Sequence, residues 1–171
     1  MKIYSKNIVN NYLDPVFGNN SNEPLVNGKV KKSFHIQWED LPLGTKSIAI
    51  NFYDDDAIPI AGFTWIHWLA ANIDPEWNEL AVNSSVDLKH KFVQGKNSWS
   101  SGLLDESSQD HDAFYGGPAP PNSDHEYTVE VYALDKMLPL KNGFLGNELK
   151  KAMKGHILGT SKMTFMYKKL N

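Results

Sequence analysis

The sequence contains no cysteine, and this absence excludes disulfides, cysteine nucleophiles and thiolate metal sites. Long apolar runs are missing too, since no stretch reaches the about 20 residues of a membrane-spanning helix. The N-terminus lacks the apolar segment and cleavage site of a secretion signal. A net charge of -3 provides no basic surface for nonspecific nucleic-acid binding. We therefore expect a cytoplasmic protein that neither spans a membrane nor binds nucleic acid.

The composition is that of an ordinary folded chain. The sequence has 171 residues, of which 41% are hydrophobic, so it is long enough to bury a substantial core. A chain of this length predicts one domain over residues 1–171.

Alternating apolar and polar residues predict a mostly β protein. Alternation of period two is typical of half-buried strands, and long apolar runs are typical of central strands. The predicted strands are Lys2–Ser5, Ser33–Trp38, Ser47–Tyr53, Phe63–Ile73, Glu126–Leu134 and His156–Lys168. We expect two packed antiparallel sheets, a β-sandwich with one or two short helices, with Phe52 and Trp68 in the core.

Two other segments differ from this pattern. Asn147–Lys154 has helical spacing, with Asn147 as its expected N-cap and Gly155 as its C′ residue. Asn83–Asp112 is rich in Ser, Asn, Gly and Asp, which predicts a long loop. Loops of this length in compact domains are usually functional or packed by their own side chains.

The run Asp54-Asp55-Asp56 directly follows a predicted strand. Taken alone, it is more typical of a solvated acidic turn than of a site. A calcium loop needs alternating oxygen ligands, a glycine turn and a distal Glu. The following residues, Ala57 to Ile60, supply none of these, so no metal site is predicted.

Two histidines occur in the same context on two predicted strands. Trp65 and His67 are two residues apart, and His125 and Tyr127 repeat that spacing, so each pair projects from one face. A lone histidine in an apolar strand is more often a core residue than a ligand. Two such pairs favour a ligand site more strongly than one does. If their strands are neighbours in the sheet, the two pairs line one wall of a pocket.

A glycine- and proline-rich loop, Gly116–Pro121, precedes the second pair. Prolines restrict its conformers, and glycines allow close backbone approach. A backbone N–H there, such as that of Ala119, can point into a cavity and receive an anion. A rigid structural turn is an equally good interpretation. No Gly-x-Ser-x-Gly elbow accompanies it, so a nucleophilic triad is not predicted.

The order of these segments resembles the phosphatidylethanolamine-binding protein family, also called Raf kinase inhibitor-like proteins, in its bacterial branch. The similarity runs from about Phe34 to the C-terminus, and the first thirty residues match poorly. The segments that carry it are Leu41–Ser47, Asp54–Ala57, His67–Asn72, Gly95–Ser98, Tyr115–Pro121, His125–Tyr127 and Tyr132–Asp135.

The resemblance implies a β-sandwich-like fold with a small anion pocket at one end of the central sheet. By motif position it assigns seven ligand-binding residues, which are Asp54, Trp65, His67, Ala119, Pro121, His125 and Tyr127. Asp54 is expected to accept a hydrogen bond from a histidine, whose other ring nitrogen then donates to the ligand. Tyr127 adds a hydroxyl donor and Ala119 a backbone donor.

Three positions depart from the family pattern. Asp55 and Ile58 stand where the acidic motif usually has proline, and Glu126 replaces an arginine at the expected pocket rim. The last change weakens the attraction for anions, so Glu126→Arg is expected to tighten binding. Protonation of a pocket histidine, with a reference pKa of about 6.5, is expected to strengthen anion binding as the pH falls.

Three functional hypotheses remain open. The first is a non-enzymatic protein that binds a small phosphate- or carboxylate-bearing ligand without a cofactor. The second is an inhibitory protein that contacts a kinase or protease through exposed loops. The third is a hydrolase with His67 or His125 as base, which the missing nucleophile disfavours. A target protein and a homodimer are the open partner hypotheses.

Overall fold

The protein is described by a computed structural model that covers residues 1–23, 25, 28–105 and 113–170. The strands are β1 (Lys2–Tyr4), β2 (Ile8–Val9), β3 (Tyr12–Leu13), β4 (Ile36–Glu39), β5 (Ser47–Asp54), β6 (Trp65–Ile73), β7 (Glu79–Leu80), β8 (Val93–Gly95), β9 (His125–Leu134) and β10 (Ile157–Tyr167). The helices are α1 (Ile58–Ala61), α2 (Ser84–Asp87) and α3 (Gly146–Met153), with 3-10 turns η1 (Pro15–Phe17), η2 (Pro75–Trp77) and η3 (Ser98–Ser100).

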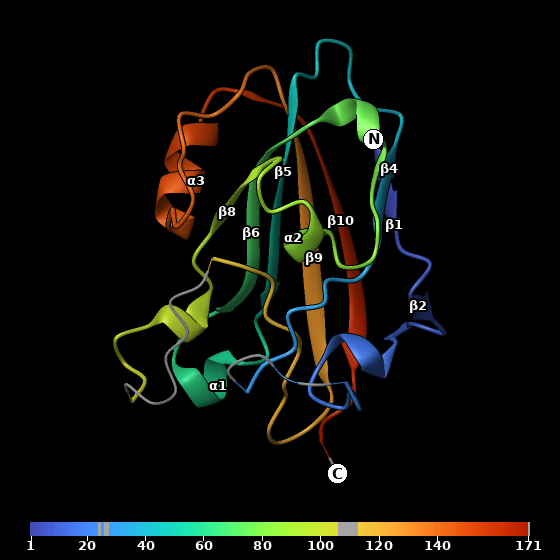
Figure 1. Ribbon diagram of the computed structural model, residues 1–171, viewed down its shortest axis with the longest axis vertical. Helices are drawn as coiled ribbons and strands as arrows, with labels where there is room; N and C mark the ends of the chain where they lie inside the picture. The colour runs from blue at the N-terminus through green and yellow to red at the C-terminus, as the bar shows by residue number, and fades with distance from the viewer. Residues whose placement is uncertain (24, 26–27, 106–112, 171) are drawn as a thin grey trace.

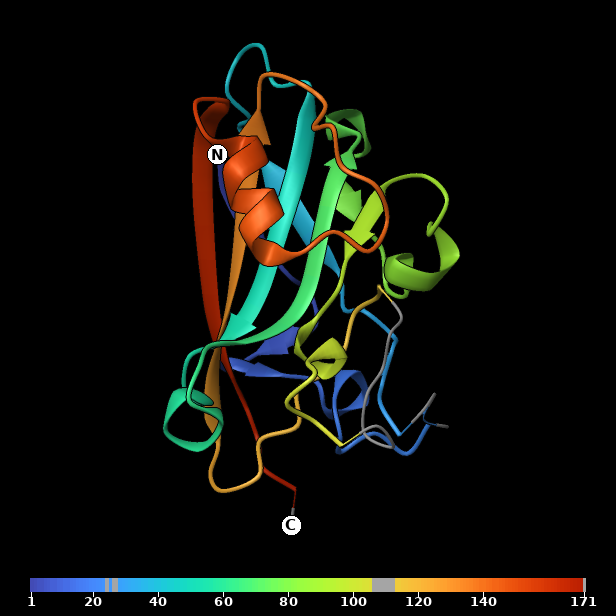
Figure 2. The ribbon, with the colours of Figure 1, turned by 90° about the vertical axis from the view of Figure 1, so that its left-hand side faces the viewer.

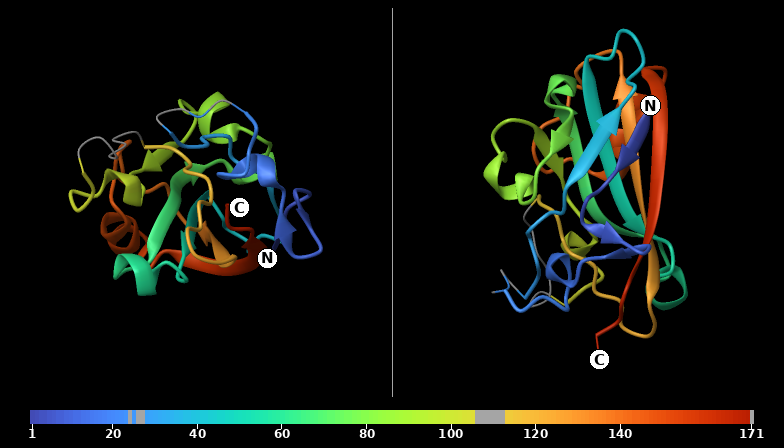
Figure 3. Two further views of the ribbon diagram at one scale, coloured as in Figure 1. Left: turned by 90° about the horizontal axis from the view of Figure 1, so that it is seen from below. Right: turned by 90° about the vertical axis from the view of Figure 1, so that its right-hand side faces the viewer.

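The described strands form two sheets that pack face to face (Figures 1 and 3). The small sheet has the order β1-β4-β7, and the large one has the order β2-β3-β10-β9-β5-β6-β8. The pairs are antiparallel except for β3 with β10. Phe34 and Trp38 from the small sheet's side meet Phe52, Trp68 and Phe165 from the large sheet in one buried cluster. The predicted mostly β fold is therefore confirmed, with Phe52 and Trp68 in its core.

The opposite face of the large sheet is covered by α3 (Figure 2). Leu149 and Met153 of the helix pack on Ala49 of β5 and Leu69 of β6 in a second buried cluster. The apolar stripe of α3 thus faces the sheet, as expected of an amphipathic helix on a surface. No helix in the described part of the chain is long and apolar enough to cross a membrane. The cytoplasmic location stays a prediction.

The helix predicted at Asn147–Lys154 is present but begins earlier. Its N-cap is Leu145, whose backbone N–H donates to the carboxylate of Glu148 over 2.7 Å. The prediction of Asn147 as the cap is therefore wrong, because Glu148 satisfies an open donor of the first turn from inside the helix. Gly155 follows the helix with φ +81°, a left-handed conformation that suits the predicted C′ glycine.

The segment 83–112 is not a featureless loop in its described part, which contains α2, β8 and η3. Several of its polar side chains, including Ser85 and Gln94, are buried and paired. Trp68 Nε1 donates to Gln94 Oε1 over 2.7 Å, and the Ser85 hydroxyl donates to the same oxygen over 2.8 Å. Because buried polar groups that are paired cost little, a polar composition here conceals packed structure. Residues 106–112 lie outside the described residues.

Candidate functional site

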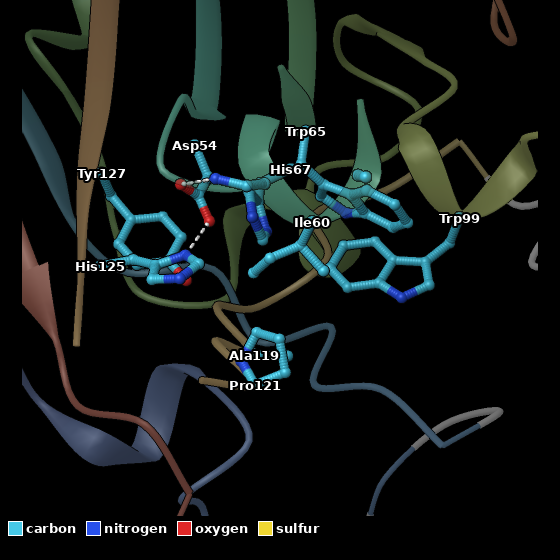
Figure 4. Close-up of a pocket in the computed structure, with 11 residues that line it drawn as sticks. Asp54, Ile60, Trp65, His67, Trp99, Ala119, Pro121, His125 and Tyr127 are labelled. Carbon is cyan, nitrogen blue, oxygen red and sulfur yellow. Dashed lines mark hydrogen bonds and ion pairs between the residues drawn. The ribbon is translucent and has the colours of Figure 1, made fainter. Parts of the chain in front are cut away.

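A cavity of about 240 Å³ opens at one end of the large sheet, where β5 and β6 meet and β9 begins (Figure 4). Its lining residues are Asp54, Ala57, Ile60, Ala61, Trp65, His67, Trp99, Ala119, Pro121, His125 and Tyr127. All seven residues that the family resemblance assigned to the ligand site lie in this lining. Asp54, His67, His125 and Tyr127 are 3% exposed or less and form its floor, whereas Ala119 and Pro121 are exposed at its rim.

The pairing of the strands explains why these residues meet. Asp54 is the last residue of β5, and its Cα is paired with Tyr127 on β9 and with Trp65 on β6. Paired residues project from the same face of a sheet, so the three side chains converge. The two histidine-bearing strands are not neighbours, because β5 lies between them. The carboxylate of Asp54 thus stands between the two aromatic–histidine pairs.

His67 occupies an irregular position in β6. Phe52 is paired with Trp68, but the next residue of β5, Tyr53, is paired with Ile66, so His67 is the extra residue of a β-bulge. The bulge lets His67 and Trp68, which are adjacent in sequence, both lie on the inner face and both be buried. Strict alternation would have turned one of them outward.

The imidazole of His67 is held by the backbone of the following loop. Nδ1 lies 2.8 Å from the carbonyl oxygen of Gly116, while the Gly116 N–H donates to the His67 carbonyl over 2.9 Å. Burial lowers the pKa of His67 to about 4, against the opposing pull of the Gly116 and Gly117 carbonyls. The expectation that mild acid charges a pocket histidine is therefore wrong for His67.

Asp54 and His125 form a buried pair. His125 Nδ1 donates to Asp54 Oδ2 over 2.8 Å, and the Ala57 N–H donates to Asp54 Oδ1 over 3.1 Å. Desolvation raises the pKa of Asp54, and the hydrogen bond from His125 opposes that rise. The expected aspartate–histidine bond is present, but His125 Nε2 lies 2.8 Å from Asn122 Oδ1 instead of being free to donate to a ligand.

Two hydrogen-bond donors in the lining are buried without a partner among the described residues. They are the indole Nε1 of Trp65 and the hydroxyl of Tyr127, and the latter lies beside the Asp54 carboxylate and the Ala119 backbone without a hydrogen bond of normal length and angle. Burial, followed by the charge of Asp54, raises the pKa of Tyr127 well above its usual range, so the phenol keeps its proton. An unpaired buried donor costs about 1–3 kcal/mol. Both groups therefore favour an incoming acceptor.

Sequence reasoning missed one aromatic wall of the cavity. Trp99 lies edge-on to Trp65, with ring centroids 5.3 Å apart, and edge-on to His67 at 5.1 Å. It is placed by η3, where the Asn97 side chain accepts the Trp99 N–H over 3.1 Å. The segment Gly95–Ser98, which the family resemblance includes, ends just before Trp99 and was the available signal. The lining also includes Ile60 and Ala61 of α1.

The remaining acidic residues face away from the floor. Asp55 accepts from the Thr64 hydroxyl over 2.6 Å, and Asp56 accepts from the backbone N–H of Glu126 over 2.8 Å. Glu126 lies between His125 and Tyr127 on β9, so its exposed side chain projects from the other face of the sheet. The prediction that Glu126 stands at the pocket rim is therefore wrong.

Comparison with known proteins gives a consistent result. The family model of phosphatidylethanolamine-binding protein matches residues 6–168, so the match includes most of the N-terminal residues that resembled the family poorly. The uncharacterized protein YxkA of Bacillus subtilis is 44% identical over 134 residues, 78% of this chain and 80% of that protein. YbhB of Escherichia coli is 29% identical over 135 residues, 78% of this chain and 79% of that protein. The crystal structure of Escherichia coli YbcL, a member of the mammalian family, matches with a TM-score of 0.78 at 24% identity over 99% of this chain and 98% of that one.

Proposed function

The chain belongs to the phosphatidylethanolamine-binding protein family, in the bacterial branch that includes YbhB, and on that premise we propose a binding function without catalysis. The pocket takes the phosphate or carboxylate group of a small molecule. The observation that carries this proposal is a pair of buried donors in one cavity, Trp65 Nε1–H and Tyr127 O–H, that make no hydrogen bond of normal geometry with the described residues. An oxyanion supplies the acceptors that both donors need.

The size of the cavity supports a small ligand group. Pockets for drug-sized ligands measure roughly 300–1,000 Å³, whereas this one measures about 240 Å³. A phosphate or carboxylate fits that space, with the remainder of the molecule passing outward between Trp99 and the exposed residues Ala119 and Pro121 (Figure 4).

The composition of the lining also supports binding over hydrolysis. The described lining residues include no Ser, Thr or Lys that could act as a nucleophile. The one aspartate, Asp54, is engaged by His125 and by the Ala57 N–H. Both ring nitrogens of His125 are held by neighbouring oxygens, so His125 is not free to act as a base. His67 has only Nδ1 held, but no hydroxyl of a Ser or Thr stands beside it in the described lining.

Isothermal titration with inorganic phosphate tests the proposal. We expect saturable binding that is weakened about tenfold in Trp65→Phe, which removes one buried donor but keeps the aromatic ring. Trp77→Phe is the matched control, because Trp77 lies outside the cavity lining. Equal phosphate affinity in the wild type and Trp65→Phe, or no heat of binding in either, contradicts the proposal.

A second candidate, contact with a target protein, is favoured by one observation. Ile58 and Ile60 on α1 are 45% and 51% exposed, and Ile60 also lines the cavity. Exposed apolar side chains beside a pocket are typical of a protein contact. The variant Ile58→Ser, at a residue outside the cavity lining, should weaken inhibition of a target but leave phosphate binding intact.

A further inference from the structure

The hydrogen-bonding pattern of the pocket floor restricts which oxyanion can bind. The restriction begins at His67, whose Nδ1 lies 2.8 Å from the carbonyl oxygen of Gly116. A carbonyl oxygen can only accept, so Nδ1 must carry a proton. A neutral imidazole carries a single N–H, so Nε2 presents a lone pair.

The proton stays on Nδ1 of His67, and the lone pair on Nε2, throughout the neutral pH range. His67 is 2% exposed, and burial holds its pKa at about 4, so the ring stays neutral until the solution is strongly acidic. The bulge in β6 and the reciprocal bond from the Gly116 N–H to the His67 carbonyl fix the ring's position. His67 lines the cavity, and its tautomer cannot change without breaking the bond to Gly116, so the ring nitrogen left for a ligand is an acceptor.

The rest of the floor contains both hydrogen-bond acceptors and hydrogen-bond donors. Asp54 adds a carboxylate whose two oxygens already accept from His125 and from the Ala57 N–H. Trp65 and Tyr127 provide the buried donors. A bound oxyanion must accept from these donors and, at the same time, place a hydrogen toward Nε2 of His67. An oxyanion without any proton can direct only a lone pair at that nitrogen.

We propose that the pocket selects oxyanions that retain a proton, and that phosphate monoesters as monoanions are its ligand class, whereas phosphate diesters and sulfate are rejected. The proposal rests on the anion-binding function inferred above and adds a requirement for one P–O–H donor. In a monoester monoanion the P–O–H group donates to His67 Nε2, and the remaining oxygens accept from Trp65 and Tyr127. A diester has the same single charge but has no hydrogen to donate.

Two simple ligands with the same charge, one with a P–O–H group and one without, test whether the proton of the ligand is required. At pH 5.5 methyl phosphate is largely a monoanion with one P–O–H, because its second pKa is about 6, while dimethyl phosphate is a monoanion without one. Isothermal titration of the wild-type protein should give at least about tenfold tighter binding of methyl phosphate. Sulfate, which is tetrahedral and unprotonated at this pH, should bind more weakly than inorganic phosphate.

Two variants test whether His67 causes the preference for methyl phosphate over dimethyl phosphate. In His67→Asn, the side-chain amide can still donate to the Gly116 carbonyl, but no acceptor equivalent to Nε2 remains. The ratio of the two ester affinities should fall to within about twofold of one. Trp65→Phe removes a donor that both esters use, so it should weaken both and preserve their ratio. Thermal unfolding of each variant shows whether the fold is retained, and the wild-type ester pair decides the question if His67→Asn does not fold.

The possible results distinguish this inference from the function on which it rests. Equal binding of methyl and dimethyl phosphate overturns the proton requirement and leaves an anion pocket in place. Failure of methyl phosphate, dimethyl phosphate, inorganic phosphate and sulfate all to bind overturns the anion pocket itself. A preserved ester ratio in a folded His67→Asn protein also overturns the inference, because the discrimination then arises elsewhere.

Discussion

His67 and Gly116, 49 residues apart in sequence, are joined by two reciprocal hydrogen bonds, one from the ring to the Gly116 carbonyl and one from the Gly116 N–H to the His67 carbonyl. The first bond sets the tautomer of the histidine, and the second ties the glycine–proline loop to β6. The loop and the strand thus form one unit of the pocket. Changes that loosen the loop should therefore also change the chemistry that the ring presents.

The first prediction concerns stability and pH. The folded-state pKa of His67 is lowered to about 4, whereas a histidine in the unfolded chain titrates near 6.5. Between these values the unfolded state binds more protons, so His67 makes the free energy of unfolding decrease as the pH falls from about 6.5 to about 4. The upper limit of this loss is about 3 kcal/mol. Urea unfolding of the wild type and His67→Asn across this range measures it.

The difference between the two proteins is the informative quantity, because other groups also titrate. Asp54 acts in the opposite direction, since its raised pKa means that protonation below that pKa favours the folded state. Both proteins contain Asp54, so its contribution largely cancels. If the stability difference between wild type and His67→Asn is independent of pH, His67 is not buried as a neutral ring.

The second prediction separates stability from binding at Tyr127. Its hydroxyl is buried beside the Asp54 carboxylate and the Ala119 backbone but makes no hydrogen bond of normal length and angle with a described residue, so removing it relieves a poorly paired polar group. Tyr127→Phe should raise the free energy of unfolding by up to about 1 kcal/mol while weakening phosphate binding about tenfold. Tyr115→Phe is the control, because the Tyr115 hydroxyl donates to the Phe17 carbonyl over 2.8 Å and its loss should destabilise. A destabilised Tyr127→Phe would show that the hydroxyl is paired.

The third prediction concerns the contact between the loop and the N-terminal segment. A Cβ at Gly117 would overlap the carbonyl oxygen of Phe17 and approach Val30 within 3.1 Å. Backbone atoms cannot move aside as a side-chain tip can, so Gly117→Ala should destabilise by about 1–3 kcal/mol. Gly102→Ala should change stability by less than about 0.5 kcal/mol, because a Cβ there meets no described residue within 4 Å. Equal melting temperatures for the two variants would contradict this packing.

The sequence predicted the main strands and the two aromatic–histidine pairs because both depend on local periodicity, whereas the other site residues came from the family resemblance. Trp65 with His67 and His125 with Tyr127 repeat at a spacing of two, and a strand turns that spacing into a shared face. The strands themselves were found to within a few residues for the same reason, for example Ser47–Tyr53 against the observed Ser47–Asp54.

Features that depend on pairing between distant parts of the chain could not be predicted from the sequence. Nothing local to β6 indicates that His67 is a bulge residue, because a bulge is defined by the partner strand. Nor does the sequence show that β5 separates the two histidine strands. The polar segment that contains Ser85 and Gln94 was interpreted as loop because its side chains find their hydrogen-bond partners only in the folded core.

The last prediction corrects the expectation for Glu126→Arg. The side chain of Glu126 projects from the face of β9 opposite to His125 and Tyr127 and is exposed to solvent, where charge effects are weak and screened by salt. At physiological ionic strength the substitution should therefore change phosphate affinity by less than about twofold. The backbone N–H of residue 126, which donates to Asp56, is unaffected by the change of side chain. A larger gain in affinity, persisting at high salt in isothermal titration, would mean that the arginine reaches the ligand around the end of the sheet.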